Sequence, residues 1–225
     1  MREFFRAAVL TCVCALTAQA ETFYSTLTGP QLAFSNDTYT IAGADNWMAR
    51  SASVGVAFTP GVTGRLDAVD LAMSTSMVHF LFPKDVSVTL HASEAGLPGA
   101  VIETLGTVSE LPTKSRWNPP AVTTVYSSTR PMLVQGTEYF LTINAEQANA
   151  IALWHQSSDD ALKGIYRADA PGAAWTLSPD ELLPAFAVQG TAVGTLSFSA
   201  PASIAPTPSA LGAGLLGLLV VARRR

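Results

Sequence analysis

Short stretches in which apolar and polar residues alternate run through the middle of the chain. In residues 53–58 every second residue is Val or Phe, and in residues 86–91 every second residue is Val or Leu. A period of two places one set of side chains on one face of an extended strand. Gly, Pro, Ser and Asn separate the predicted strands, which cover residues 53–58, 66–73, 86–91, 138–143, 151–155 and 185–189. This pattern predicts an all-β chain folded as an antiparallel β-sandwich.

Residues 66–73 contain two alternate sets of side chains. We expect the more apolar set to face inward, namely Asp67, Val69, Leu71 and Met73. The same alternation places Asp67 and Asp70 on opposite faces of the strand.

Turns are predicted where Gly and Pro interrupt the alternation. Residues 59–61, 97–99 and 135–136 have the composition of tight turns. Residues 145–150 and 178–182 are the two places where a short helical turn is expected. In the second of these, Ser178 can cap a helix that begins at Pro179.

The first 20 residues are typical of a secretory signal peptide with a short signal helix. Arg2 and Arg6 precede an apolar core at residues 7–16, and Ala18 and Ala20 form a small-x-small cleavage signal. A signal peptidase would then leave Glu21 as the first residue. A membrane anchor is the alternative, but this apolar run is too short to span about 30 Å of hydrocarbon.

Both cysteines of the chain, Cys12 and Cys14, lie in this predicted leader. A lipoprotein would be anchored through Cys12, but Thr11 stands where a smaller residue is wanted. The exported chain is therefore expected to contain neither a disulfide nor a thiolate metal site.

The C-terminal segment has three parts in a fixed order. A Pro/Ser/Ala linker at 200–209 ends in Pro206, Thr207, Pro208 and Ser209, an uncharged apolar run follows at 210–222, and the last residues are Arg223, Arg224 and Arg225. This order resembles the PEP-CTERM sorting tail, which implies a short transmembrane helix at 210–225 and processing by an exosortase-like membrane protease. Thr207 replaces the family's central Glu, which leaves the exosortase subtype open. A plain tail anchor without processing is the alternative.

The charge of the chain is divided unevenly between the ends and the body. The whole chain has a net charge of -4, with 13 Lys and Arg against 17 Asp and Glu. Five of the basic residues and one acid lie in the two terminal segments, so residues 21–208 hold 8 basic and 16 acidic residues. An acidic body argues against nucleic acid as a partner, since that requires a basic footprint.

The order of motifs in the body is similar to that of the choice-of-anchor R domain, a bacterial exported module. The motifs include Ala57-Phe58-Thr59-Pro60-Gly61, Gly96-Leu97-Pro98-Gly99, Leu153-Trp154 and Ala185-Phe186-Ala187-Val188-Gln189-Gly190. The resemblance covers about residues 35–192 of a β-sandwich domain placed at 21–199. It implies a jelly-roll-like β-sandwich and brings no catalytic residues.

No motif for catalysis is found in the chain. His79, His91 and His155 lack the spacing of metal ligands, the nucleophile elbow GxSxG is absent, and we expect each histidine to be an edge-strand or surface residue. Asp159 and Asp160 could contribute oxygen ligands to a Ca²⁺ ion, and the alternative is a solvated acidic loop. We therefore expect no enzyme and no cofactor beyond this weak Ca²⁺ candidate.

The four tryptophans are candidates for ligand contact or for the core. Trp47 and Trp117 have polar neighbours on irregular segments, so they are candidate ligand-binding residues that could stack on sugar rings. The resemblance to the choice-of-anchor R domain implies that Trp154 and Trp175 cap the core of the sandwich, since their places match the family's aromatic positions.

These observations predict a non-enzymatic protein that crosses the inner membrane and is held there transiently by its C-terminal helix. An exosortase-like system would then sort it to the cell surface or extracellular matrix. The body would be a structural or glycan-interaction module, with exopolysaccharide as one possible partner. The alternatives are a membrane-anchored carbohydrate-binding protein and an exopolysaccharide hydrolase.

Overall fold

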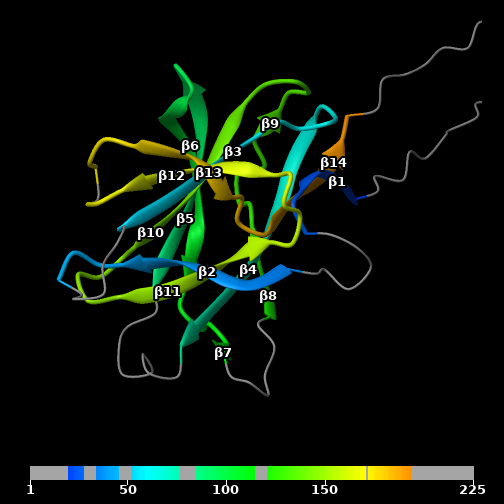
Figure 1. Ribbon diagram of the computed structural model, residues 1–225. Helices are drawn as coiled ribbons and strands as arrows, with labels where there is room; N and C mark the ends of the chain where they lie inside the picture. Colours follow the sequence, from blue (N-terminus) through cyan, green and yellow to red (C-terminus); the bar gives the residue numbers. More distant parts are fainter. Residues whose placement is uncertain are drawn as a thin grey trace, which may run out of the picture. The chain divides into compact units, whose positions relative to one another are not determined.

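The computed structural model describes residues 20–27, 34–45, 52–76, 85–114, 121–170 and 172–193. These residues form two sheets packed as a β-sandwich, and none of them is helical (Figure 1). All strand pairs are antiparallel except a short parallel pairing of β7 with β4. The all-β sandwich expected from the sequence is confirmed. The predicted signal helix and transmembrane helix lie outside the described residues.

The eight-stranded sheet is organised around β4, which is thirteen residues long. β14 and β11 pair with one side of β4, while β8 and β9 pair with the other. Its strands are β1 (Ala20–Ser25), β2 (Phe34–Ala42), β4 (Gly64–Ser76), β7 (Thr113–Lys114), β8 (Ala121–Tyr126), β9 (Met132–Leu133), β11 (Ile151–Ser157) and β14 (Phe186–Ala192).

The six-stranded sheet has the strand order β13-β12-β3-β10-β5-β6. Its strands are β3 (Ser53–Phe58), β5 (Val86–Glu94), β6 (Leu97–Val108), β10 (Tyr139–Ala145), β12 (Lys163–Ala168) and β13 (Thr176–Leu182). Each of the six strands predicted from the alternation lies within one of the observed strands or overlaps it almost completely.

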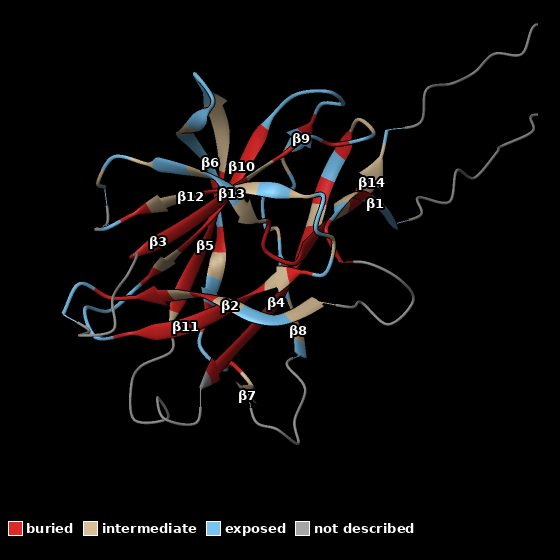
Figure 2. Cartoon of the chain, viewed as in Figure 1, coloured by how far each residue is buried: buried red, intermediate tan, exposed pale blue. Residues whose placement is uncertain are grey.

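The core lies between the two sheets and is built from the apolar set of each strand (Figure 2). Register brings these sets together in the six-stranded sheet, where Ile143 of β10 is opposite Val54 of β3 on one side and Val88 of β5 on the other. From the eight-stranded sheet, Trp154 and Phe186 are fully buried and meet edge to face with their ring centroids 6.1 Å apart. The tryptophan also donates a hydrogen bond of 3.1 Å from Nε1 to the carbonyl of Ala185.

Three expectations about turns and short helical turns are wrong. Residues 97–99 belong to β6, and the turn lies one step earlier at Ala95 and Gly96, which both have positive φ. Residues 178–182 belong to the edge strand β13, where the pairing with β12 shifts register between Lys163 and Ile165. This irregularity accommodates Pro179 on an edge strand, where a missing backbone donor is tolerated. Residues 135–136 form the predicted turn, and residues 146–149 form a turn rather than a helix.

Asp67 does not face inward as the alternation suggested. The pairing of β4 with β14 shifts register here, because Ala68 is opposite Gln189 while Leu66 is opposite Gly190. The extra residue changes the phase of the alternation, so Leu66 joins the core. Asp67 and Asp70 contact Thr191 and Gln189, two alternate residues of β14, so both lie on the outer face.

Candidate functional site

A row of polar side chains covers the outer face of the six-stranded sheet. Val54, Val56 and Phe58 of β3 belong to the core, so the intervening residues of β3 face outward. The same alternation turns the polar residues of β5 and β10 outward, because their apolar residues fill the core. These outward residues are Ser53 and Gly55 of β3, Ser87, Thr89 and His91 of β5, and Thr142 and Asn144 of β10.

A pocket of about 460 Å³ opens on this face. Its lining combines hydroxyl, amide and imidazole groups with one indole, contributed by Ser53, Ser87, His91, Thr142, Asn144, Glu146, Ala168 and Trp175 among others. The lining residues come from β3, β5, β10 and β12, from Glu146 just after β10, and from the connection between β12 and β13. Such a mixture of an aromatic wall with a few placed polar groups is typical of small-molecule and sugar sites.

Hydrogen bonds hold the polar groups of the pocket in fixed orientations. His91 Nδ1 lies 2.9 Å from the carbonyl oxygen of Gly99, and since a carbonyl can only accept, Nδ1 carries the proton. His91 Nε2 lies 3.1 Å from Thr142 Oγ1, so in the neutral imidazole it accepts the threonine proton. Asn144 Nδ2 lies 3.5 Å from the same hydroxyl oxygen, to which it donates. The pocket therefore presents a connected row of donors and acceptors.

Trp175 lies on the outer face of the sheet and not in the core. It is half-buried, and its ring lies over Gly55: a Cβ added to that glycine would be 3.3 Å from the ring carbon Cζ3. The absence of a side chain at Gly55 makes room for the indole. The expectation that Trp175 caps the core is therefore wrong. The same expectation for Trp154 is confirmed, because Trp154 is buried in the core.

The remaining sequence candidates for ligand contact and processing fall mostly outside the described residues. These are Trp47, Trp117, Ala18 and the whole set Pro206, Thr207, Pro208, Ser209, Arg223, Arg224 and Arg225. At the predicted signal cleavage site, Ala20 and Glu21 are exposed and begin β1, where Glu21 is opposite Gly190 of β14. Among the described residues, no helix has the length and hydropathy needed to span a membrane.

Asp159 has a structural contact within its own loop. Its Oδ1 accepts a hydrogen bond of 3.0 Å from the backbone N–H of Ala161, and its own N–H donates to Ser157 Oγ at 3.1 Å. Within the described ranges, no group of three or more His, Cys, Asp and Glu side chains is placed to hold a metal ion. A Ca²⁺ ion bound by Asp159 and Asp160 stays a prediction from sequence.

A second histidine forms a buried pair with a serine. His155 Nε2 lies 2.8 Å from Ser74 Oγ, and its Nδ1 lies 3.1 Å from the carbonyl of Ser35. Both side chains are fully buried, so this pair does not offer a hydroxyl nucleophile to a substrate in solution. The buried position also contradicts the expectation that every histidine is at an edge or on the surface; His79 is outside the described residues.

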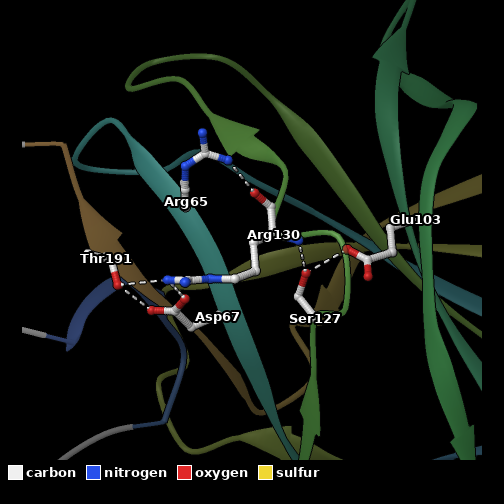
Figure 3. A network of polar contacts seen from close by, with 6 residues as sticks. All are labelled: Arg65, Asp67, Glu103, Ser127, Arg130 and Thr191. Atoms are coloured by element: carbon white, nitrogen blue, oxygen red, sulfur yellow. Dashed lines mark hydrogen bonds and ion pairs between the residues drawn. The ribbon is translucent and has the colours of Figure 1, made fainter. Parts of the chain in front are cut away.

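Glu103 is a buried carboxylate that is used entirely within the fold (Figure 3). It accepts hydrogen bonds from Ser127 Oγ at 2.6 Å, from the Ser128 N–H at 2.7 Å and from the Thr129 N–H at 3.0 Å. Burial alone would raise the pKa of Glu103, but these hydrogen bonds lower it to about 2. The carboxylate therefore stays charged and holds the loop after β8 against β6.

The other end of the same loop is held by an ion pair. Arg130 contacts Asp67, and Thr191 bridges them by donating to Asp67 at 2.6 Å and accepting from Arg130 at 3.1 Å (Figure 3). Arg65 donates to the carbonyl of Arg130 at 3.4 Å. This network fixes the loop between β8 and β9, so its acids and bases serve the fold.

The sequence predicted three strands that line the pocket, β3, β5 and β10, but neither β12 nor the pocket itself. The alternation placed the polar residues of 86–91 and the hydroxyl at position 142 on the solvent-facing side of predicted strands. Their meeting with Ser53 and Trp175 depends on pairings between strands far apart in the sequence. Comparison of the chain with protein-family models, with curated proteins and with solved structures gives no match.

Proposed function

We propose that this protein is a non-enzymatic exported protein whose jelly-roll-like body binds neutral glycans on the outer face of its six-stranded sheet. The observation that carries the proposal is the pocket of about 460 Å³ in which the indole of Trp175 adjoins a row of fixed hydroxyl, amide and imidazole groups. An indole face matches the apolar face of a sugar ring, and the polar row matches its hydroxyls.

The charge of the lining favours a neutral ligand. Glu146 is the charged acid among the described residues that line the pocket, and neither Lys nor Arg is found there. A carboxylate without a cation beside it repels acidic sugars. Hydrolysis by a glycosidase uses two carboxyl groups about 5–10 Å apart, which a lining with one carboxylate does not provide. This supports binding without catalysis.

The test is titration of the protein with neutral and acidic oligosaccharides, with product analysis by mass spectrometry. Trp175→Ala should weaken binding about five- to tenfold, because an aromatic stacking contact contributes roughly 1–1.5 kcal/mol. Tyr126→Ala is the matched control, since Tyr126 is an exposed aromatic residue on β8 of the other sheet. Equal affinity of wild type and Trp175→Ala would contradict the proposal, and cleaved product would favour the hydrolase.

We also propose that an exosortase-like protease sorts the protein to the cell surface or extracellular matrix, after a signal peptidase has removed residues 1–20. The order of Pro206-Thr207-Pro208, the apolar run at 210–222 and the three arginines supports this. In an exosortase-containing bacterium, replacing Pro206 and Pro208 by alanine should leave unprocessed protein in the membrane. An unchanged mass and location would favour the plain anchor.

A further inference from the structure

A second pocket, of about 450 Å³, lies farther along β3 and is lined by residues of β3, β12 and β13 and by Tyr24 of β1 in the other sheet. Its lining is more aromatic and apolar, with Tyr24, Ala57, Gly164, Tyr166, Leu177 and Pro179 among its residues. Tyr24, Leu162 and Leu183 of this lining also pack in or against the core.

The two pockets follow the same strands. On β3 the outward residues are Ser53, Gly55 and Ala57; Ser53 lines the first pocket and Ala57 lines the second. Four residues of extended chain separate these two positions, which is about 13 Å at roughly 3.3 Å per residue. On the neighbouring strand β12, Ala168 borders the first pocket and Tyr166 the second.

Two aromatic rings lie on the stretch between the pockets. Trp175 lies over Gly55, and Tyr166 is the cross-strand partner of that same glycine. Phe140 fixes the orientation of the Tyr166 ring, since the two rings meet edge to face at 83° with centroids 4.9 Å apart. Gly164 has a φ of +109°, which a side chain would strain, so this position in the lining of the second pocket favours glycine.

The polar and charged groups suit an uncharged ligand along the whole length. Burial, and then the carboxylate of Glu138, raise the pKa of Tyr166, so its phenol is neutral and can donate to a sugar hydroxyl. Lys163 lines the second pocket and Glu146 the first, so the combined lining has no net charge.

We propose that the two pockets form one continuous binding groove for an extended neutral glycan chain, with Tyr166 and Leu177 as the second subsite. The groove recognises the interior of a polysaccharide in addition to a single terminal sugar. This inference rests on the proposed glycan-binding function, because the first pocket is its starting point.

The experiment measures affinity of the full chain for a length series of one to six sugar residues, cut from β-1,4-glucan, β-1,3-glucan and mannan. Affinity for the matching backbone should rise about tenfold or more from the shortest to the longest member. Tyr166→Ala and Leu177→Ala should remove this gain and leave binding of the shortest member unchanged. Trp175→Ala should weaken binding at every length.

Leu177→Ala guards against loss of folding, because Leu177 is 46% exposed. The far-UV circular dichroism spectrum reports the fold of each variant. Binding that does not depend on length, or that Tyr166→Ala and Leu177→Ala weaken equally at all lengths, would overturn the extended groove and leave the proposed function in place. No binding of any neutral oligosaccharide would overturn both.

Discussion

Replacing Glu103 by glutamine should destabilise the protein by about 2 kcal/mol at pH 7. The side chain is 5% exposed and accepts hydrogen bonds from two backbone N–H groups and two hydroxyls of residues 127–129. Glutamine is nearly the same size, but it replaces one charged acceptor by an amide donor. Hydrogen bonds to a charged group contribute about 1.5–3 kcal/mol each in net terms, and only part of this set is lost.

The pH dependence gives a second estimate of the size of the effect. The pKa of Glu103 is lowered from 4.5 to about 2, so the charged form is favoured in the folded state. Its contribution to stability is therefore fully present above about pH 5 and is lost as the pH falls toward 2. At about 1.4 kcal/mol for each tenfold change in proton affinity, the upper limit is about 3 kcal/mol.

Urea unfolding followed by tryptophan fluorescence and circular dichroism measures this directly. At pH 7 the midpoint of Glu103→Gln should fall by about 1 M urea, for a slope of about 2 kcal/mol per M. At pH 3 the difference between wild type and variant should shrink to about half. Glu110→Gln, at an exposed carboxylate after β6, is the control. A difference between wild type and Glu103→Gln that is constant from pH 7 to pH 3 would refute this account of the loop.

Three further outcomes test the packing. Trp154→Ala should lower the free energy of unfolding by about 3–5 kcal/mol, since the side chain is fully buried; a loss below about 1 kcal/mol in urea unfolding contradicts its place in the core. Gly190→Ala should destabilise more than Gly136→Ala, because a Cβ on Gly190 would lie 2.4 Å from a backbone oxygen of β4, whereas a Cβ on Gly136, at φ +75°, meets nothing within 4 Å. Equal thermal midpoints for these two variants would contradict that geometry. Asp67→Asn should reduce stability by less than about 1 kcal/mol, and the reduction should fade in 1 M salt, since the ion pair with Arg130 is partly exposed; a loss that salt does not change would mean a buried role.

Much of the fold could be predicted from local pattern, because strand burial follows a period of two. Residues 86–91 and 138–143 showed their inward sets directly, and both sets fill the core as expected. The pattern failed at Asp67, where one extra residue in β4 changes the phase of the alternation. It also failed at Ser178 to Leu182, where pairing with β12 overrides the local preference for a helical turn.

The candidate site was much less predictable. Trp175 was expected in the core because it resembles a core aromatic residue of the family pattern, but hydrophobicity alone does not say which face of a sheet an aromatic ring covers. Its position is decided by Gly55, 120 residues earlier, whose missing side chain leaves space for the indole. The local sequence around Gly55 and around Trp175 does not indicate that the two residues are in contact.

By itself, the sequence determined that the body is an acidic, strand-rich domain between two apolar and basic terminal segments, because composition and alternation are local properties. Only the tertiary structure decided that Ser53, His91 and Thr142 line one pocket. It also decided that the carboxylate of Glu103 accepts hydrogen bonds from the loop after β8. The physical reason is that neighbours across a sheet are set by register between distant strands, so a site on the face of a sandwich exists only after those strands have paired.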